Sequence, residues 1–419
     1  MHRTSKYVLT FLALLAAVAV ADGAKKKTGR KAANPGPSAE VLMEQGREAY
    51  LAYDFEKASR LFSQANAKAK NLPEEEAEKL SDYRRQLLAA ENFMERVEKI
   101  AVIDSLTVPR EEFFAHYRIP VSSGTLRGGG DLPSSLGEAD YVFTNEGGDY
   151  KLWAAPDTTG YYRLMESSLL TDGEWSQASP LPDNLAEGGD EIYPFMMSDG
   201  VTLYYADNGE NSIGGYDIMV ATRDPSDGSF LQPSNLGFPY NSPYDDYLLA
   251  IDELNGVGWW ATDRNQLDDA LTVYVFVTND LRQNYSEDDA DDLTPFARID
   301  DFRATQPEDA DYTELLETIA RIDPNQKVKH VDFRLPLGDG KILTSYDELP
   351  GQTAKAAMKR YLAAKASLES EETALERLRK RYYVSRSSQT ASQIRSMETD
   401  VEGQRENLRK LRSAVYDSL

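Results

Sequence analysis

Residues 199–221, "DGVTLYYADNGENSIGGYDIMVA", place two runs of β-forming residues on either side of a polar loop that contains a Gly-Gly pair. β-branched and aromatic residues favour strands, and a glycine-containing loop between two such runs favours a hairpin. The stretch therefore predicts a β-hairpin, and the flanking sequence shows whether that hairpin stands alone.

The features of this hairpin recur downstream at a spacing of 55 or 56 residues. The matched positions are Trp175 and Phe230, Gly200 and Gly256, Tyr204 and Trp259, and Asp207 and Asp263. A looser copy, "ADYVFTNEGGDYKLWAAPD", lies upstream. Each copy reads as a strand, a turn, a strand that ends in Asp, a loop, a strand and a short fourth strand. A fixed internal period of this kind predicts a repeat architecture.

This unit resembles the WD40-like (PD-type) β-propeller repeat of TolB-type periplasmic proteins. The resemblance covers about residues 138–280, and it implies propeller blades over residues 117–285. Closed propellers use at least about four blades, and three are visible here. We expect Tyr117–Leu126 and Val328–Leu343 to complete the ring, and an open stack of blades is the alternative.

The N-terminus predicts export. In residues 1–21, Arg3 and Lys6 precede an apolar stretch that ends in the cleavage pattern Ala19-Val20-Ala21, which is typical of a signal peptide. The mature chain would begin near Asp22 with a basic linker over residues 22–37. Because the chain has no cysteine, we expect neither disulfides nor a lipid-modified N-terminus. A periplasmic protein, reaching the outer membrane through partners alone, is the resulting expectation.

Residues 38–107 are predicted to form a small helical domain. Gly46, Ala58, Phe62 and Ala65 stand at the offsets of the tetratricopeptide signature, so this stretch resembles one tetratricopeptide unit. Generic packing of two helices is the alternative. The next repeat length does not continue the signature, since Leu80, Asn92, Arg96 and Lys99 occupy the corresponding positions. Residues Glu74–Ile103 read instead as one long amphipathic helix.

The C-terminal third divides into two predicted parts. Residues 286–350 contain an acidic loop, a short helix and a β-hairpin, and residues 351–419 predict a coiled-coil helical hairpin. Apolar residues keep a 3-4 spacing with one polar layer at Gln404. The seam positions are Met358, Tyr361, Leu368, Leu375, Tyr382, Ile394, Met397, Val401, Gln404, Leu408, Leu411 and Val415. Their phase slips by one residue in between, which favours a turn near Ser385–Ser388 over one continuous helix. The predicted fold class is a multidomain α+β protein.

The charge is distributed unevenly. Residues 131–312 hold 37 acidic and 7 basic side chains, a net charge of −30, whereas residues 352–419 hold 14 basic and 9 acidic side chains. An acidic surface repels nucleic acids and anionic lipids, and it attracts basic proteins. We therefore expect protein partners, some of them basic, and no binding of nucleic acid.

Three stretches look at first like binding sites, but each is better interpreted as part of the structure. Asp207–Asn211 resembles a calcium loop, but Gly209 stands where an EF-hand needs an oxygen ligand. Tyr204, Tyr205, Trp259 and Trp260 suggest a sugar platform, but neighbours in a strand face opposite sides, which favours the core. "TDGEWS" at residues 171–176 reads as a turn between strands.

Catalytic patterns are missing from the sequence. Beyond the signal peptide only His116 and His330 remain, and there is no Cys, G-x-S-x-G elbow, H-E-x-x-H motif or Walker loop. The Gly128-Gly129-Gly130 run precedes Asp131-Leu132-Pro133 and no helix, so it predicts no phosphate cradle. The sequence predicts no catalytic, cofactor-binding or metal-binding residue, and a protein that is not an enzyme.

Together these parts resemble periplasmic scaffold proteins that join a tetratricopeptide-like module to WD40-like blades, including envelope components associated with type IX secretion. No OmpA-like peptidoglycan-binding domain is visible here, so the resemblance does not extend to peptidoglycan anchoring or secretion. The expected function is a non-catalytic scaffold that binds other cell-envelope proteins, with self-association through the C-terminal helices also open. A carbohydrate-binding or glycan-processing propeller is the alternative.

Overall fold

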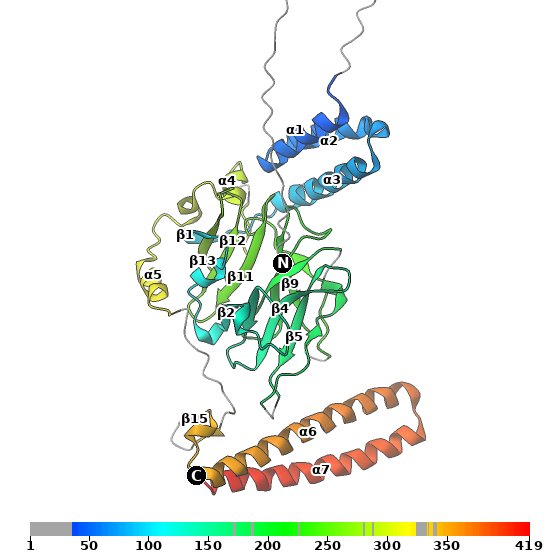
Figure 1. Ribbon diagram of the computed structural model, residues 1–419, viewed down its shortest axis with the longest axis vertical. Coiled ribbons are helices and arrows are strands. Elements are labelled where there is room, and N and C mark those ends of the chain that lie inside the picture. Colours follow the sequence, from blue (N-terminus) through cyan, green and yellow to red (C-terminus); the bar gives the residue numbers. More distant parts are fainter. Residues whose placement is uncertain are drawn as a thin grey trace, which may run out of the picture. The chain divides into compact units, whose positions relative to one another are not determined.

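The computed structural model describes most of the chain from residue 36 onward (Figure 1). The described residues are 36–170, 173–185, 188–224, 227–279, 281–286, 289–323, 333, 335–337 and 342–419. The predicted signal peptide, nearly all of the basic linker and the turn at Thr171-Asp172 lie outside them. Within the described residues the protein is mixed α+β, with N-terminal helices, several antiparallel sheets and C-terminal helices.

Three helices open the described chain, namely α1 (Ala39–Leu51), α2 (Phe55–Ala67) and α3 (Glu74–Met94). The side chain of Asp54 caps α2 by accepting a hydrogen bond from the Lys57 backbone N–H at 3.0 Å. A Cβ added at Gly46 would lie 2.5 Å from the Phe62 ring, and Phe62 is buried. Gly46 therefore lets helix α1 approach the Phe62 ring of α2 more closely than a larger residue would allow.

The expectation of one helix over Glu74–Ile103 is wrong. Helix α3 ends at Met94, and β1 (Ala101–Pro109) is an antiparallel strand that pairs with β13 (Ala270–Val277). The stretch contains Val102, Ile103, Thr107 and Val108, whose β-branched side chains fit a strand. Pairing with a distant strand supplies the backbone hydrogen bonds that a longer helix would otherwise have made.

The sheets follow the chain almost in order. The first contains β2 (Thr125–Gly128), β3 (Tyr141–Thr144), β4 (Tyr150–Pro156), β5 (Tyr162–Ser168) and β6 (Ser179–Pro180). The second contains β7 (Glu191–Met196), β8 (Thr202–Asp207), β9 (Asp217–Thr222) and β10 (Ser234–Asn235). The third contains β11 (Asp246–Asp252), β12 (Val257–Thr262), β13 and, beyond it, β1. The hairpin predicted from residues 199–221 is β8–β9, and its strands pair from Thr202↔Thr222 to Asp207↔Asp217.

The sequence repeat is matched by a repeat in backbone conformation. In the turn between two successive strands of each sheet, Gly148, Gly200 and Gly256 have φ angles of +71°, +67° and +66°. These are left-handed values that glycine adopts without steric cost. Tyr193 in β7 and Leu248 in β11 also have positive φ, and each lies at a bulge where the strand register shifts. The second and third sheets are therefore built to one pattern.

The ring closure expected from the flanking strands is not observed. Within the described residues the sheets form no closed barrel or propeller. Of Tyr117–Leu126, only Thr125 and Leu126 enter a strand, β2 of the first sheet. In Val328–Leu343, β14 (Leu335–Pro336) pairs with β15 (Ile342–Leu343). Leu335 and Leu343 bury their side chains in a cluster with the C-terminal helices instead of extending a blade, because apolar residues of those helices lie next to them.

Two short helices, α4 (Thr294–Arg298) and α5 (Thr313–Ala320), follow the sheets, and two long ones end the chain. Helix α6 (Gly351–Ser385) and helix α7 (Ser388–Tyr416) run antiparallel (Figure 1), so the predicted turn near Ser385–Ser388 is confirmed and the single continuous helix is wrong. Leu368, Leu375 and Val401 are buried in their seam. Across the described residues, no helix combines the length and apolar character needed to cross a bilayer.

Candidate binding cleft

Helices α1–α3 share one hydrophobic core with loops of the second and third sheets. The ring of Phe238, which follows β10, lies 5.6 Å from Tyr53, 6.3 Å from Phe55 and 6.4 Å from Phe93, measured between ring centroids. Gly237 packs so closely that an added Cβ would lie 2.6 Å from Phe93. The helices are therefore joined to the sheets by a buried aromatic cluster.

Hydrogen bonds fix the same junction at the β8–β9 loop. The Tyr50 hydroxyl donates to the Ile213 carbonyl oxygen at 2.5 Å, and the Gln86 side-chain amide donates to the Gly214 carbonyl oxygen at 2.8 Å. The buried Asp217 side chain accepts from the N–H groups of Ile213 and Gly214, and burial raises the pKa of Asp217 well above its usual range. This loop is thus held between the carboxylate of one strand and the face of the helices.

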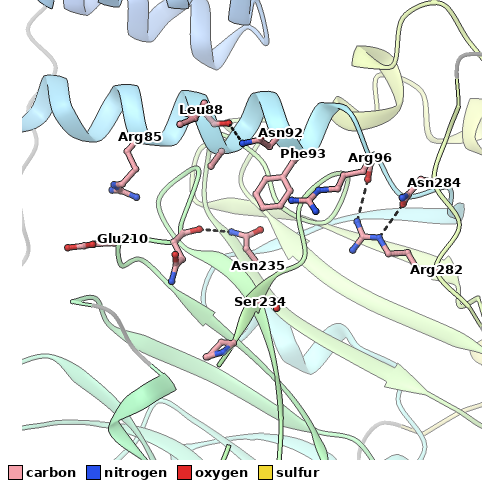
Figure 2. A pocket seen from close by; sticks show the side chains of 13 residues that line it. Arg85, Leu88, Asn92, Phe93, Arg96, Glu210, Ser234, Asn235, Arg282 and Asn284 are labelled. Carbon is pink, nitrogen blue, oxygen red and sulfur yellow. Dashed lines mark hydrogen bonds between the residues drawn. The ribbon is translucent and has the colours of Figure 1, made fainter. Parts of the chain in front are cut away.

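A cleft of about 770 Å³ lies where α3 passes over this loop and the strand β10 (Figure 2). We call it the α3 cleft. Its lining residues are Arg85, Leu88, Ala89, Asn92, Phe93 and Arg96 from α3 and the turn after it, and Glu210, Asn211, Pro233, Ser234, Asn235, Arg282 and Asn284 from the opposite side. A volume of this size lies in the range of ligand-binding clefts in proteins.

The helical residues of the cleft form one face of α3. They recur at intervals of three and four positions, which places side chains one above another on a helix surface. Leu88 on this face is 63 % exposed. Asn92 donates to the Leu88 carbonyl oxygen at 2.9 Å, so its amide is aligned along the helix (Figure 2). Leu88, Asn92 and Arg96 on this face are exposed, whereas Phe93 packs against Phe238, so only part of the face is buried by the sheets.

Three arginines line the cleft, although the sheet segment opposite α3 is strongly acidic. Arg85 pairs with Asp82 at 3.3 Å, and Arg282 pairs with Glu98 at 3.4 Å and donates to the Arg96 carbonyl oxygen. The Arg96 guanidinium lies over the Phe93 ring, 5.3 Å from its centroid, and has no carboxylate partner among the described residues. The Arg85–Asp82 pair is exposed on both sides, and exposed ion pairs contribute only about 0–1 kcal/mol, so an incoming carboxylate can exchange with Asp82.

The cleft offers donors beside apolar surface. The lining includes three guanidinium groups, the amides of asparagine residues and the single hydroxyl of Ser234, beside Phe93 and Leu88, and Glu210 is its one carboxylate. Arg side chains bind carboxylates through paired N–H donors. The arrangement suits the binding of an extended segment that carries carboxylates and an apolar side chain.

Two of the stretches for which the sequence suggested chemistry are Asp207–Asn211 and the paired aromatic residues. Only the first of them contributes residues to the α3 cleft. Asp207 ends β8 and accepts from the Gly209 N–H at 2.9 Å, whereas Glu210 and Asn211 of the same stretch line the cleft. No group of three or more acidic or histidine side chains within metal-binding reach occurs in the described part of the chain. The expectation that the paired aromatic residues belong to the core is confirmed for Tyr205, Trp259 and Trp260, which are all buried.

The sequence singled out only some of the residues that line the α3 cleft. It singled out Asn92 and Arg96 as departures from the tetratricopeptide signature, and both line the cleft. It missed Arg85 and Arg282. One signal for Arg282 was available, because it is one of only seven basic residues in the segment 131–312. Comparisons with known protein families, with curated proteins and with solved structures find no match to this chain.

Proposed function

We propose that this protein is a non-catalytic interaction protein of the bacterial cell envelope, exported to the periplasm, whose α3 cleft binds an acidic, partly apolar segment of a partner protein. The helices then act as a tetratricopeptide-like module, and the three sheets act as WD40-like blades of an incomplete or open propeller. The observation that carries the proposal is the α3 cleft, which three arginines and an exposed leucine line along its length.

Rigidity supports a binding role. The cleft walls are held by the aromatic cluster around Phe238 and by the hydrogen bonds from Tyr50 and Gln86 to the β8–β9 loop. A preformed site loses little conformational entropy when a ligand binds, which favours affinity. The cationic cleft and the acidic surface elsewhere then recognise partners of opposite charge.

The α6–α7 hairpin is the second proposed contact region. Its seam is satisfied within the hairpin, and Tyr383 near its turn is 74 % exposed. Deleting Thr353–Leu419 would leave the sheets folded and remove either a partner or self-association. A truncated chain that keeps its mass in solution and all of its partners would restrict the hairpin to a structural role.

The test of the cleft uses the mature chain and a fluorescent peptide that contains several glutamates and two leucines. Reversing two charges with Arg85→Glu and Arg96→Glu should weaken binding about tenfold, because each exposed pair is worth up to ~1 kcal/mol. The matched control is Arg84→Glu, an exposed position on the same helix that does not line the cleft.

Two outcomes would reject this assignment. If Arg84→Glu weakens peptide binding as much as the cleft variant does, the peptide is attracted by the overall charge of the protein and not by the cleft. Unchanged binding in both means that the peptide sits elsewhere. A glycan array on the same protein tests the carbohydrate-binding alternative, whose stacking platform is weakened by the burial of Trp259 and Trp260.

A further inference from the structure

A smaller cavity, separate from the α3 cleft, lies between the α1–α2 turn and the third sheet. Its volume is about 270 Å³ (compared with about 770 Å³ for the α3 cleft). Tyr53 reaches it from the turn, Arg264 from the end of β12, and Arg298 and Asp300 from the end of α4. Three segments that are distant in the sequence therefore meet at one small space.

Arg264 is a buried cation with part of its hydrogen-bonding capacity unused. Its Nη2 donates to Asp246 at 3.0 Å and to the carbonyl oxygens of Pro239 and Tyr240, and its Nε donates to Thr262 at 3.0 Å. Its Nη1 is buried and has no hydrogen-bond partner among the described residues. A guanidinium carries two N–H donors on this nitrogen, and buried donors of a charged group are rarely left unpaired.

The second unpaired donor is the hydroxyl of Tyr53. It is also buried without a hydrogen-bond partner in the described part of the chain. Burial raises the pKa of Tyr53 above its usual range, so the hydroxyl keeps its proton and can donate. Two independent groups lining one cavity thus lack an acceptor.

We infer that this cavity is a binding site for a single carboxylate group, held by Arg264 Nη1 and the Tyr53 hydroxyl with Arg298 at its rim. Guanidinium and phenol donors together match the oxygens of a carboxylate. Asp246 and Asp300 already pair with the two arginines, so a multiply charged anion such as phosphate would be repelled. The volume suits a small carboxylic acid or one acidic group of a peptide.

The experiment titrates the mature chain with acetate and propionate, using calorimetry and thermal unfolding. Saturable binding should raise the unfolding temperature, and the neutral analogue propionamide should have no effect. Tyr53→Phe should weaken binding about tenfold, because it removes one of two buried donors. A second arm compares a short peptide with a free C-terminal carboxylate and its amidated form, which separates a free acid from a peptide as the source.

Tyr50→Phe provides the matched control. The Tyr50 hydroxyl donates to Ile213, so its removal should lower the unfolding temperature without changing carboxylate binding. Tyr53→Phe should leave the ligand-free unfolding temperature unchanged or raise it, because the substitution removes a buried hydroxyl that has no hydrogen-bond partner in the described part of the chain. If no carboxylate saturates the site, the inference is overturned. If Tyr53→Phe also destabilises the ligand-free protein as Tyr50→Phe does, the two donors bind only water.

Discussion

The N-terminal and C-terminal helices differ in where they bury their apolar faces. The hydrophobic cluster of α1–α3 includes Ile213 and Phe238 from loops of the sheets. Among the described residues, the clusters of α6 and α7 contain side chains only from Phe333 onward. Both regions are amphipathic in sequence, yet one completes the core of the sheets and the other forms a core of its own. An amphipathic sequence therefore does not show whether a helix will pack against a neighbouring domain or form a separate core with another helix.

The polar contacts differ in the same way. At the α1–α3 junction, buried hydrogen bonds run from Tyr50 to a backbone carbonyl of the sheets. The hairpin instead links its helices by Arg379–Glu398 at 2.7 Å and Arg405–Glu372 at 2.5 Å, with all four side chains partly exposed. Since exposed pairs contribute little, the hairpin depends on its apolar seam. We expect the junction to unfold together with the sheets and the hairpin to unfold separately.

The largest effect is expected from Phe238→Ala. It removes a buried ring from the shared core and should lower the free energy of unfolding by about 3–5 kcal/mol. The four tryptophans all lie in the segment 153–260, so fluorescence follows the sheets while circular dichroism follows the helices. Both signals should shift to lower urea together. Loss of helical signal with unchanged fluorescence would show that α1–α3 do not share a core with the sheets.

Leu375→Ala tests whether the α6–α7 hairpin unfolds separately from the sheets. This seam residue is 4 % exposed, and its truncation should destabilise α6 and α7 by about 2–4 kcal/mol. The tryptophan transition should stay in place while part of the helical signal is lost at lower urea. Tyr383→Ala, at an exposed position, is the control and should change neither transition. A shifted tryptophan transition in Leu375→Ala would mean that the hairpin supports the sheets.

The folded protein should be more stable at mildly acidic pH than at neutral pH, because two buried carboxyl groups near the α1–α3 junction have raised pKa values. Burial raises the pKa of Asp246 to about 6 against the attraction of Arg264, and it raises the pKa of Asp217 as well. A carboxyl group with a raised folded-state pKa binds its proton more readily when folded, so stability falls as pH rises from about 4 to about 6. The tryptophan transition should therefore require more urea at pH 5 than at pH 7. An unchanged or lower midpoint at pH 5 would contradict this sign.

The smallest predicted effect concerns the polar layer of the hairpin. Gln404 donates to Glu371 at 2.6 Å, but its Oε1 is buried without a hydrogen-bond partner in the described residues. Gln404→Leu should stabilise the hairpin by about 1 kcal/mol, because polar seam residues trade stability for register. Circular dichroism measures the gain, and analytical ultracentrifugation shows whether register or self-association changes. A destabilised hairpin would show that the hydrogen bond to Glu371 outweighs the buried Oε1.

Local patterns in the sequence predicted the local geometry. The repeat spacing of 55 or 56 residues predicted matched turns at Gly200 and Gly256, and the one-residue phase slip located the turn between α6 and α7. Contacts between distant segments were not predictable in this way. The pairing of Ala101 with Val277 turns a helix-like stretch into strand β1, and the approach of Arg282 to α3 creates the cleft. Neither contact leaves a periodic trace in the sequence.

Hydrogen exchange by mass spectrometry tests the central claim most directly, since it reports the free energy of opening for each segment. Helix α3 and the β8–β9 hairpin should exchange with the same high free energy, because they open only when the shared core unfolds. Helices α6 and α7 should exchange at a different free energy of their own. Exchange of α1–α3 at low free energy while β8 and β9 stay protected would contradict the shared core and, with it, a rigid α3 cleft.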